Sequence, residues 1–157
     1  MNLAFELNGK PASLNIEPRE TLAEVLRGRG RLTGVKISCE AQVCGSCTVL
    51  LDGLPVSACT VLAYEARGRR VTTIEGLADS AGRLHPLQQA FLDNFAFQCG
   101  FCTPGMILAA KALLDEKPGA TDAEIIEHMS GNLCRCTGYL PILKAIRQAA
   151  LAPRGQP

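Results

Sequence analysis

Eight cysteines, arranged as two sets of four, constrain this chain of 157 residues more than any other feature of its sequence. The N-terminus goes directly into an alternating strand pattern without an export signal, so we expect a cytoplasmic, reducing location. In such a compartment thiols stay free to bind metals or to react. We therefore expect each set to form one site. The two sets are Cys39, Cys44, Cys47 and Cys59, and Cys99, Cys102, Cys134 and Cys136.

The first set has the spacing C-x4-C-x2-C, and Cys59 follows after a predicted strand. This spacing is typical of plant-type 2Fe–2S ferredoxins, in which one tight loop carries three of the four thiolates. Gly45 and Ser46 are small residues that suit such a loop. Gln42 stands where loops of this type usually carry glycine, so we expect a strained backbone or a shifted loop there. A four-cysteine zinc site is the alternative, and the spacing favours iron–sulfur.

The second set pairs Cys99 with Cys102 and, about thirty residues later, Cys134 with Cys136. On spacing alone, zinc competes with an iron–sulfur cluster here. Each pair comes directly before a predicted helix start, where the aligned amide dipoles stabilise a group with net negative charge. The first half also has the pattern of a one-electron carrier, which a structural zinc ion would not serve. Both observations favour a cluster.

Two histidines raise a further alternative, a Rieske-type site in which histidines replace two of the four thiolates. With eight cysteines in the chain no such ligand is needed, and His85 and His128 each stand alone in a helical pattern. We expect both histidines to be structural, in a helix cap or an interface.

Residues 1–75 carry the patterns of a sheet and one helix. Alternating apolar residues at 3–7 and 12–16 flank an Asn-Gly pair, which predicts a hairpin. A short helix is predicted after Thr21, because Thr21 and Glu24 form a capping box and glycines 28 and 30 end the pattern. Further strands are predicted at 47–51, 54–57 and 70–75. This order predicts an α+β unit with one helix packed across the sheet.

Residues 76–84 are small and polar and are predicted to be a linker. Helical periodicity follows, with apolar Leu87, Phe91, Leu92 and Phe95 spaced for one face of the first helix. The stretches CGFCTPG and LCRCTGY each give a cysteine pair, a threonine and a helix start, so we expect two similar helix pairs that face each other. The helices are predicted at 85–98, 103–119, 121–130 and 139–151, and the domains at 1–75 and 85–157 around the linker.

Charge and hydropathy exclude other classes of protein. Sixteen basic and fifteen acidic residues give a net charge of +1, which argues against a nucleic-acid-binding protein that relies on bulk charge. The longest apolar runs are interrupted well short of the roughly 20 residues that a membrane span needs, so we expect no such span.

Three stretches carry a resemblance to a known family: CGSCTVLLDG, HPLQQAFLDNFAFQCGFCTPGMI and SGNLCRCTGYLPILKAI. Together they resemble the small iron–sulfur subunit of the molybdenum hydroxylases, which include xanthine and aldehyde oxidoreductases, aerobic carbon monoxide dehydrogenase and dehydrogenases of N-heterocycles. The resemblance covers essentially the whole chain. It implies an N-terminal β-grasp domain of the plant-type ferredoxin kind, followed by an all-α four-helix bundle with pseudo-twofold helix pairs.

The resemblance also implies the ligands. Two 2Fe–2S clusters are expected, one held by each set of cysteines, with the second between the two helix pairs. Gln98 is implied to contact the pterin of the molybdenum cofactor. Cys136 is implied both to ligate iron and to lie against that pterin. No residue of this chain is expected to act as a general acid, base or nucleophile.

The activity implied is electron transfer within a larger enzyme. A large molybdopterin-binding subunit would hydroxylate a carbon with oxygen from water, and its electrons would leave singly through the helical-domain cluster and then the ferredoxin-domain cluster. They would reach FAD in a medium subunit, or another acceptor, and the whole enzyme would be a heterotrimer or a dimer of heterotrimers. A free-standing ferredoxin-like carrier and a zinc-stabilised interaction module are the alternatives from other functional classes.

Overall fold

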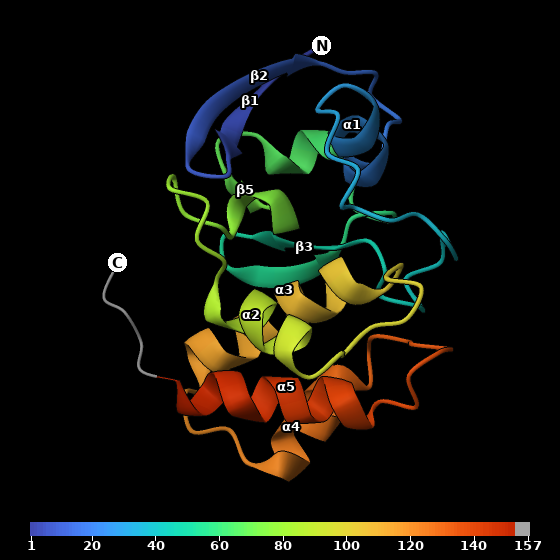
Figure 1. Cartoon of the computed structure of the whole chain (residues 1–157). Coiled ribbons are helices and arrows are strands. Elements are labelled where there is room, and N and C mark those ends of the chain that lie inside the picture. Colours follow the sequence, from blue (N-terminus) through green and yellow to red (C-terminus); the bar gives the residue numbers. More distant parts are fainter. Residues whose placement is uncertain (153–157) are drawn as a thin grey trace.

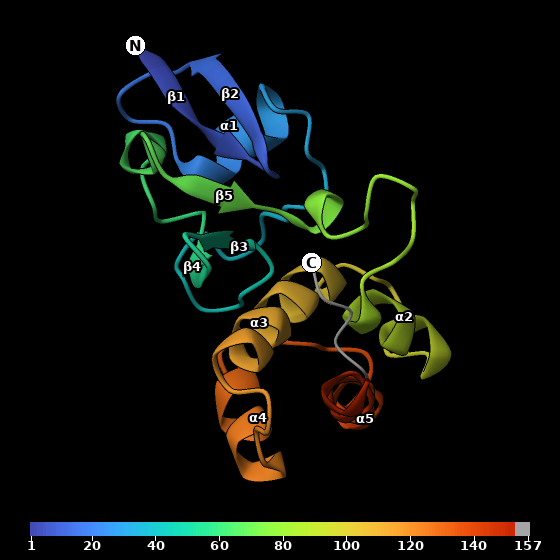
Figure 2. The same ribbon diagram turned by 90° about the vertical axis from the view of Figure 1, so that its left-hand side faces the viewer.

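The fold divides into a sheet-containing half and a helical half, as the ribbon shows from two directions (Figures 1 and 2). The computed structural model describes residues 1–152. Each half has its own hydrophobic core, one between the sheet and its helix and the other among the later helices. An α+β ferredoxin-type unit followed by a helical region is therefore confirmed.

The sheet is mixed and has five strands in the order β2-β1-β5-β3-β4. β1 pairs with β2 and β3 with β4 in antiparallel fashion, whereas β1 and β5 run parallel. A parallel pair needs a crossover connection, and α1 lies in that connection. The strands are β1 Asn2–Leu7, β2 Lys10–Asn15, β3 Thr48–Leu51, β4 Leu54–Ser57 and β5 Arg70–Thr72, and α1 is Leu22–Gly28.

Both hairpins turn on a pair of residues with positive φ. Asn8 and Gly9 have φ of 52° and 75°, and Asp52 and Gly53 have φ of 52° and 86°. Such pairs give the turn whose twist matches that of the flanking strands. The predicted hairpin at 3–7 and 12–16 is confirmed, although β1 begins one residue earlier than predicted and β2 begins two residues earlier and ends one residue earlier.

Helix α1 begins and ends where the sequence predicts. The Thr21 side chain accepts a bond from the Glu24 N–H, and the Glu24 carboxylate accepts one from the Thr21 N–H at 2.8 Å. Leu22, Val25 and Leu26 point into the core beneath the sheet and are fully buried. The capping box thus sets the start of α1, whose buried face shares a core with the strands.

The helical half contains four α-helices within the described residues, at α2 Pro86–Asp93, α3 Thr103–Glu116, α4 Asp122–Met129 and α5 Leu140–Leu151. Their core includes Phe91, Met106, Ile125, Ile142 and Ile146. Residues 153–157, at the end of the predicted second domain, lie outside the described residues. None of the described helices is long and apolar enough to cross a membrane.

Two expectations about local structure were wrong. The strand predicted at 70–75 ends at Thr72, because the side chain of Asn8 bonds both the N–H (2.8 Å) and the hydroxyl (3.0 Å) of Thr73. Ile74–Gly76 then form a turn of 3₁₀-helix. The helix predicted at 85–98 ends at Asp93, so Phe95 leaves its apolar face with φ of 50° and is 80% exposed. Leu92 is also exposed, at 45%.

The two halves meet along β3 and α3, which lie next to each other in Figure 1. A small apolar cluster joins them, made of Leu50 on β3 and Leu108 and Ala112 on α3, with Ile74 and Leu77 packed against it. The segment predicted as a linker therefore contributes Leu77 to the contact between the halves.

His85 is the N-cap of α2, which is one of the two structural roles expected for it. Its Nδ1 accepts a hydrogen bond from the Leu87 N–H at 3.2 Å, which requires an unprotonated nitrogen. Burial lowers the pKa of His85, the charge of Lys111 adds to the effect, and Asp115 opposes it. The folded chain therefore disfavours the protonated ring.

We expect the start of α2 to loosen as the pH falls. Because the pKa of His85 is lowered on folding, the unfolded segment binds the proton more readily than the folded one. The stability that the cap gives to α2 therefore falls as the pH drops below the ordinary histidine pKa of about 6.5. Amide hydrogen exchange of residues 86–93, corrected for its intrinsic pH dependence, should accelerate below that pH. In His85→Asn, which keeps a capping side chain that does not titrate, the corrected exchange rate of these residues should not increase as the pH falls. Equal pH dependence in both proteins would contradict this role of His85.

Candidate metal centre

The first cysteine loop presents one sulfur to several backbone donors. Cys39 Sγ accepts hydrogen bonds from the N–H groups of Ala41, Val43 and Cys44, each at 3.4 Å. The Ala41 bond is the strongest of the effects that lower the pKa of Cys39 to about 6. A loop that stabilises a thiolate in this way is suited to bind an electron-deficient metal.

The other two cysteines of the first set lie behind this loop. Cys47 and Cys59 are buried, and their side chains interact with each other. Burial raises the pKa of the Cys47 thiol to about 12. A thiol in this environment gives up its proton when a metal ion binds to the sulfur, so metal binding here is coupled to proton release.

The backbone of the first loop is strained at Gln42, as the sequence predicts. Gln42 has φ of 58° and Glu40 has φ of 52°, both in the left-handed region that favours glycine. The Gln42 side chain accepts a bond of 3.4 Å from the Thr60 hydroxyl, next to Cys59. The glutamine thus links the loop to the segment that carries the fourth cysteine.

The second set comes together from two segments far apart in the sequence. Cys136 Sγ lies 3.6 Å from Cys99 Sγ, and the side chains of Cys102 and Cys134 also interact. Burial is the largest cause that raises the pKa of Cys102 to about 12. Burial alone would raise the pKa of Cys134 as well, but hydrogen bonds from Thr137 outweigh it and the pKa is lowered.

The eight thiols therefore form four pairs, two in each set. The pairs are Cys39 with Cys44, Cys47 with Cys59, Cys99 with Cys136, and Cys102 with Cys134. A 2Fe–2S cluster has two irons and four cysteine ligands, so two pairs per site fit it.

A buried hydroxyl beside the second set also fits a bound cluster. Thr103 follows Cys102 directly, and its Oγ1 is buried without a hydrogen-bond partner among the described residues. Buried hydroxyl groups are normally paired. A sulfur-rich group held by the neighbouring thiols would offer an acceptor of the kind that this hydroxyl lacks.

The two cysteine loops contact each other directly. The N–H of Leu133, next to Cys134, donates to the Cys44 carbonyl at 2.9 Å. The buried Asn132 side chain donates to the Gly45 carbonyl at 2.9 Å and to the Thr48 hydroxyl at 3.3 Å. These bonds join a loop of the sheet-containing half to a loop of the helical half.

Close packing makes this contact possible. A Cβ atom added at Gly105, in the first turn of α3, would lie 2.3 Å from the Gly45 carbonyl oxygen. Gly45 has φ of 67°, and a Cβ atom added there would lie 2.5 Å from the side-chain nitrogen of Asn132. Glycine is therefore needed at both positions for the two cysteine loops to approach each other.

The remaining residues singled out by sequence lie around the second set. Gln98 is exposed beside Cys99, and Cys136 is exposed as well. The Tyr139 hydroxyl accepts a bond of 2.9 Å from the Cys134 N–H. Sequence reasoning missed the parts played by Asn132 and Thr137, although both stand in the quoted stretch SGNLCRCTGY.

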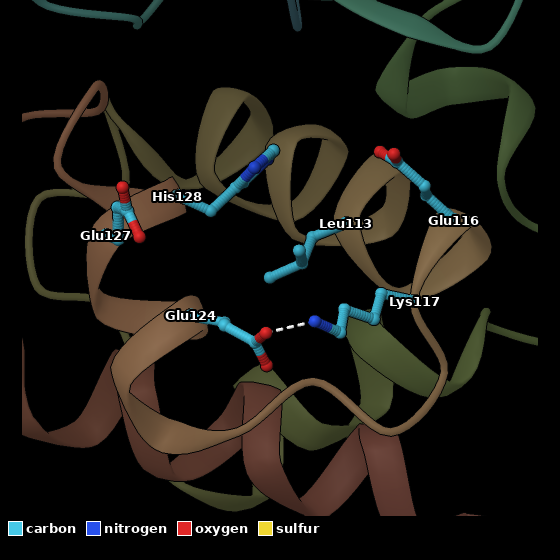
Figure 3. Close-up of a pocket in the computed structure, with 6 residues that line it drawn as sticks. All are labelled: Leu113, Glu116, Lys117, Glu124, Glu127 and His128. Carbon is cyan, nitrogen blue, oxygen red and sulfur yellow. Dashed lines mark hydrogen bonds and ion pairs between the residues drawn. The ribbon is translucent and has the colours of Figure 1, made fainter.

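The pocket between α3 and α4 is not part of the cysteine sites (Figure 3). Lys117 and Glu124 form an ion pair there, and His128 Nε2 lies 3.0 Å from the Ala109 carbonyl oxygen. His128 is thus bound to the backbone and His85 caps a helix, so neither takes part in a Rieske-type ligand set.

Comparison with known proteins identifies both halves. A 2Fe-2S iron-sulfur cluster binding domain matches residues 5–73, and a second 2Fe-2S binding domain matches residues 73–147. The nicotine 6-hydroxylase small subunit of Paenarthrobacter nicotinovorans is 49% identical over 95% of this chain and 89% of its own length. The nicotinate dehydrogenase small FeS subunit of Eubacterium barkeri is also 49% identical, over 95% of this chain and 94% of its own length.

Solved structures agree with the sequence comparison. A chain of quinoline 2-oxidoreductase from Pseudomonas putida 86 superposes with a TM-score of 0.92 at 47% identity, over 96% of this chain and 93% of that one. Aldehyde oxidoreductase from Desulfovibrio desulfuricans gives 0.90 at 42% identity, over 95% of this chain and 17% of that one. In that enzyme the equivalent of this chain is one part of a longer polypeptide.

Gln42→Gly should be tolerated and should stabilise the loop. Glycine removes a left-handed strain of about 1 kcal/mol, partly offset by the lost bond to Thr60 and by the greater freedom of the unfolded chain. Visible absorbance should show both clusters retained, and chemical denaturation should show an equal or higher midpoint. Ala41→Gly, next to it at ordinary φ, should lower the midpoint. Loss of the first cluster in Gln42→Gly would show that the glutamine is a specific part of the loop.

Proposed function

Because the chain belongs to the small 2Fe–2S subunits of the molybdenum hydroxylases, which transfer electrons within these enzymes, we propose a path for the electrons through its own residues. The chain has two 2Fe–2S-binding domains. Each cluster, when bound, takes up and passes on one electron at a time. The bonded contact between the two cysteine loops carries the proposal.

In this proposal each set of cysteines holds one cluster. The first cluster is bound by Cys39, Cys44, Cys47 and Cys59, and the second by Cys99, Cys102, Cys134 and Cys136. The close approach of the thiols in four pairs supports this assignment, because each iron takes two of them. Gly45 and Gly105 keep the two sites adjacent. The core of the first half buries Cys47 and Cys59, and Cys102 and Cys134 are partly buried against the core of the second.

The Leu133 N–H bond to the Cys44 carbonyl is the proposed bridge between the sites. It connects the backbone of Cys134, a proposed ligand of the second cluster, to that of Cys44, a proposed ligand of the first. At 2.9 Å it is a normal hydrogen bond, so the two ligand residues are separated by only a few bonds. This continuity supports sequential transfer from the helical site to the ferredoxin-type site.

The outer pair of the helical site is the proposed receiving end. Cys99 and Cys136 are exposed, and Gln98 is exposed next to them. We assign Gln98 and Cys136 the contact with the pterin of the molybdenum cofactor, held by a large partner subunit. Electrons then leave past Cys39 and Cys44 to FAD in a medium subunit, which makes the cytoplasmic enzyme a heterotrimer or a dimer of heterotrimers.

The proposed division of the chain follows the same logic. Residues 1–75 form a β-grasp domain, 76–84 a linker and 85–157 a four-helix bundle in which α2–α3 and α4–α5 are pseudo-twofold equivalents. A matching local feature supports the pseudo-symmetry: a proline occupies the first turn of both α3 and α5.

The ligand assignment predicts that Cys136→Ser damages only the helical site. In the purified enzyme, electron paramagnetic resonance should lose or alter the signal of the helical cluster and keep the ferredoxin-type signal. Reduction by substrate should fall with it, because the receiving end is broken. Cys44→Ser is the reciprocal control and should affect the ferredoxin-type signal first. Loss of the ferredoxin-type signal alone in Cys136→Ser would show that the ligands are wrongly assigned.

Purification tests the proposed assembly. The chain should co-elute with a large molybdopterin-containing subunit and carry iron and visible absorbance matching two 2Fe–2S clusters. Equimolar zinc without visible absorbance would remove both redox functions, and a monomer that reduces partners without binding a large subunit would favour the free-standing carrier.

A further inference from the structure

Three residues of the second cysteine loop form a closed hydrogen-bonded ring. The Thr137 hydroxyl donates to Cys134 Sγ at 3.1 Å, and the Thr137 N–H lies 3.4 Å from the same sulfur. The Tyr139 N–H donates to Thr137 Oγ1 at 3.2 Å. The Tyr139 hydroxyl accepts from the Cys134 N–H at 2.9 Å, which completes the ring.

This ring determines where the Thr137 proton points. A hydroxyl has one proton to donate and two lone pairs that accept. One lone pair of Thr137 Oγ1 is occupied by the Tyr139 N–H, and Cys134 Sγ is the acceptor within reach of the proton. The surrounding bonds therefore fix the hydroxyl as a donor to the sulfur.

The two cysteine sites differ in the kind of donor that they offer. At the first site, Cys39 Sγ is bonded by backbone N–H groups, which no side-chain substitution removes. At the second, Cys134 Sγ receives a hydroxyl, and in the described part of the chain Thr137 is the one hydroxyl-bearing side chain bonded to a cysteine sulfur. A side-chain donor can be changed without rebuilding the loop.

We propose that the Thr137 hydroxyl raises the reduction potential of the helical-domain cluster by donating a hydrogen bond to the Cys134 sulfur. The inference rests on the proposed ligation of that cluster by Cys134. Reduction adds negative charge to the cluster and its sulfurs, so a donor to a ligand sulfur stabilises the reduced form more than the oxidised form. Thr137 would thus make the receiving site a better electron acceptor, whereas the first site depends on its backbone.

Two substitutions separate the hydroxyl from the shape of the side chain. Thr137→Val keeps the β-branched shape and removes the donor, and Thr137→Ser keeps the donor and removes a methyl group. Ser130→Ala is a matched control, because the Ser130 hydroxyl in the same loop donates to the Glu127 carbonyl and to no sulfur. Each variant is purified as the enzyme with its partner subunits, and each cluster is titrated with reductant by electron paramagnetic resonance.

In Thr137→Val the helical-domain cluster should titrate at a lower potential than in the wild type, and the ferredoxin-type cluster should be unchanged. Thr137→Ser and Ser130→Ala should leave both potentials as they are. An unchanged potential in Thr137→Val, or an equal shift of both clusters, would overturn the proposal. A wild-type enzyme without two titrating clusters would instead refute the proposed function.

A variant that loses the cluster is also informative. If Thr137→Val fails to hold the helical-domain cluster, Thr137→Ala, which is smaller and cannot crowd the loop, takes its place in the titration. If neither holds the cluster while Thr137→Ser does, the hydroxyl is required for assembly and the tuning role is wrong.

Discussion

The contact between the two cysteine loops is the constraint on which the arrangement of the whole chain depends. The Gly45 carbonyl accepts bonds from the Thr48 hydroxyl and the Asn132 amide in a buried position, and Gly105 approaches it without a side chain. The Thr48 N–H also donates to this carbonyl at 3.1 Å, so the bond from Asn132 is the one that ties it to the helical half. The β3–α3 packing beside it holds the two halves in one orientation, so the distance between the sites is fixed by the fold.

Local chemistry explains which parts of the fold could be predicted from the sequence. The Asn-Gly turn, the capping box at Thr21 and the helix starts after the two cysteine pairs depend on residues that are close together in the sequence, and the structure confirms them. The positive φ of Gln42 was also foreseeable, because the residue stands where its loop favours glycine.

Errors arose where distant residues decide the outcome. Asn8 ends β5 from a turn more than sixty residues earlier, and no periodicity in residues 70–75 reveals it. The apolar spacing of Leu92 and Phe95 suggested one helix face, but the chain leaves the helix after Asp93 and both side chains are exposed. Asn132 was missed for the same reason, since its partners lie at the other end of the sequence.

The two sites also differ in how far apart along the chain their cysteines stand. Three thiols of the first set lie within nine residues of one another, at 39, 44 and 47, whereas the second set joins 99–102 to 134–136 across α3 and α4. The former are carried by a single loop. The four cysteines of the second set come together only once the helices have packed, because closing so long a segment costs entropy that the helical core must offset. On the proposed ligation, the second site can therefore bind iron only in a chain whose helical half has folded.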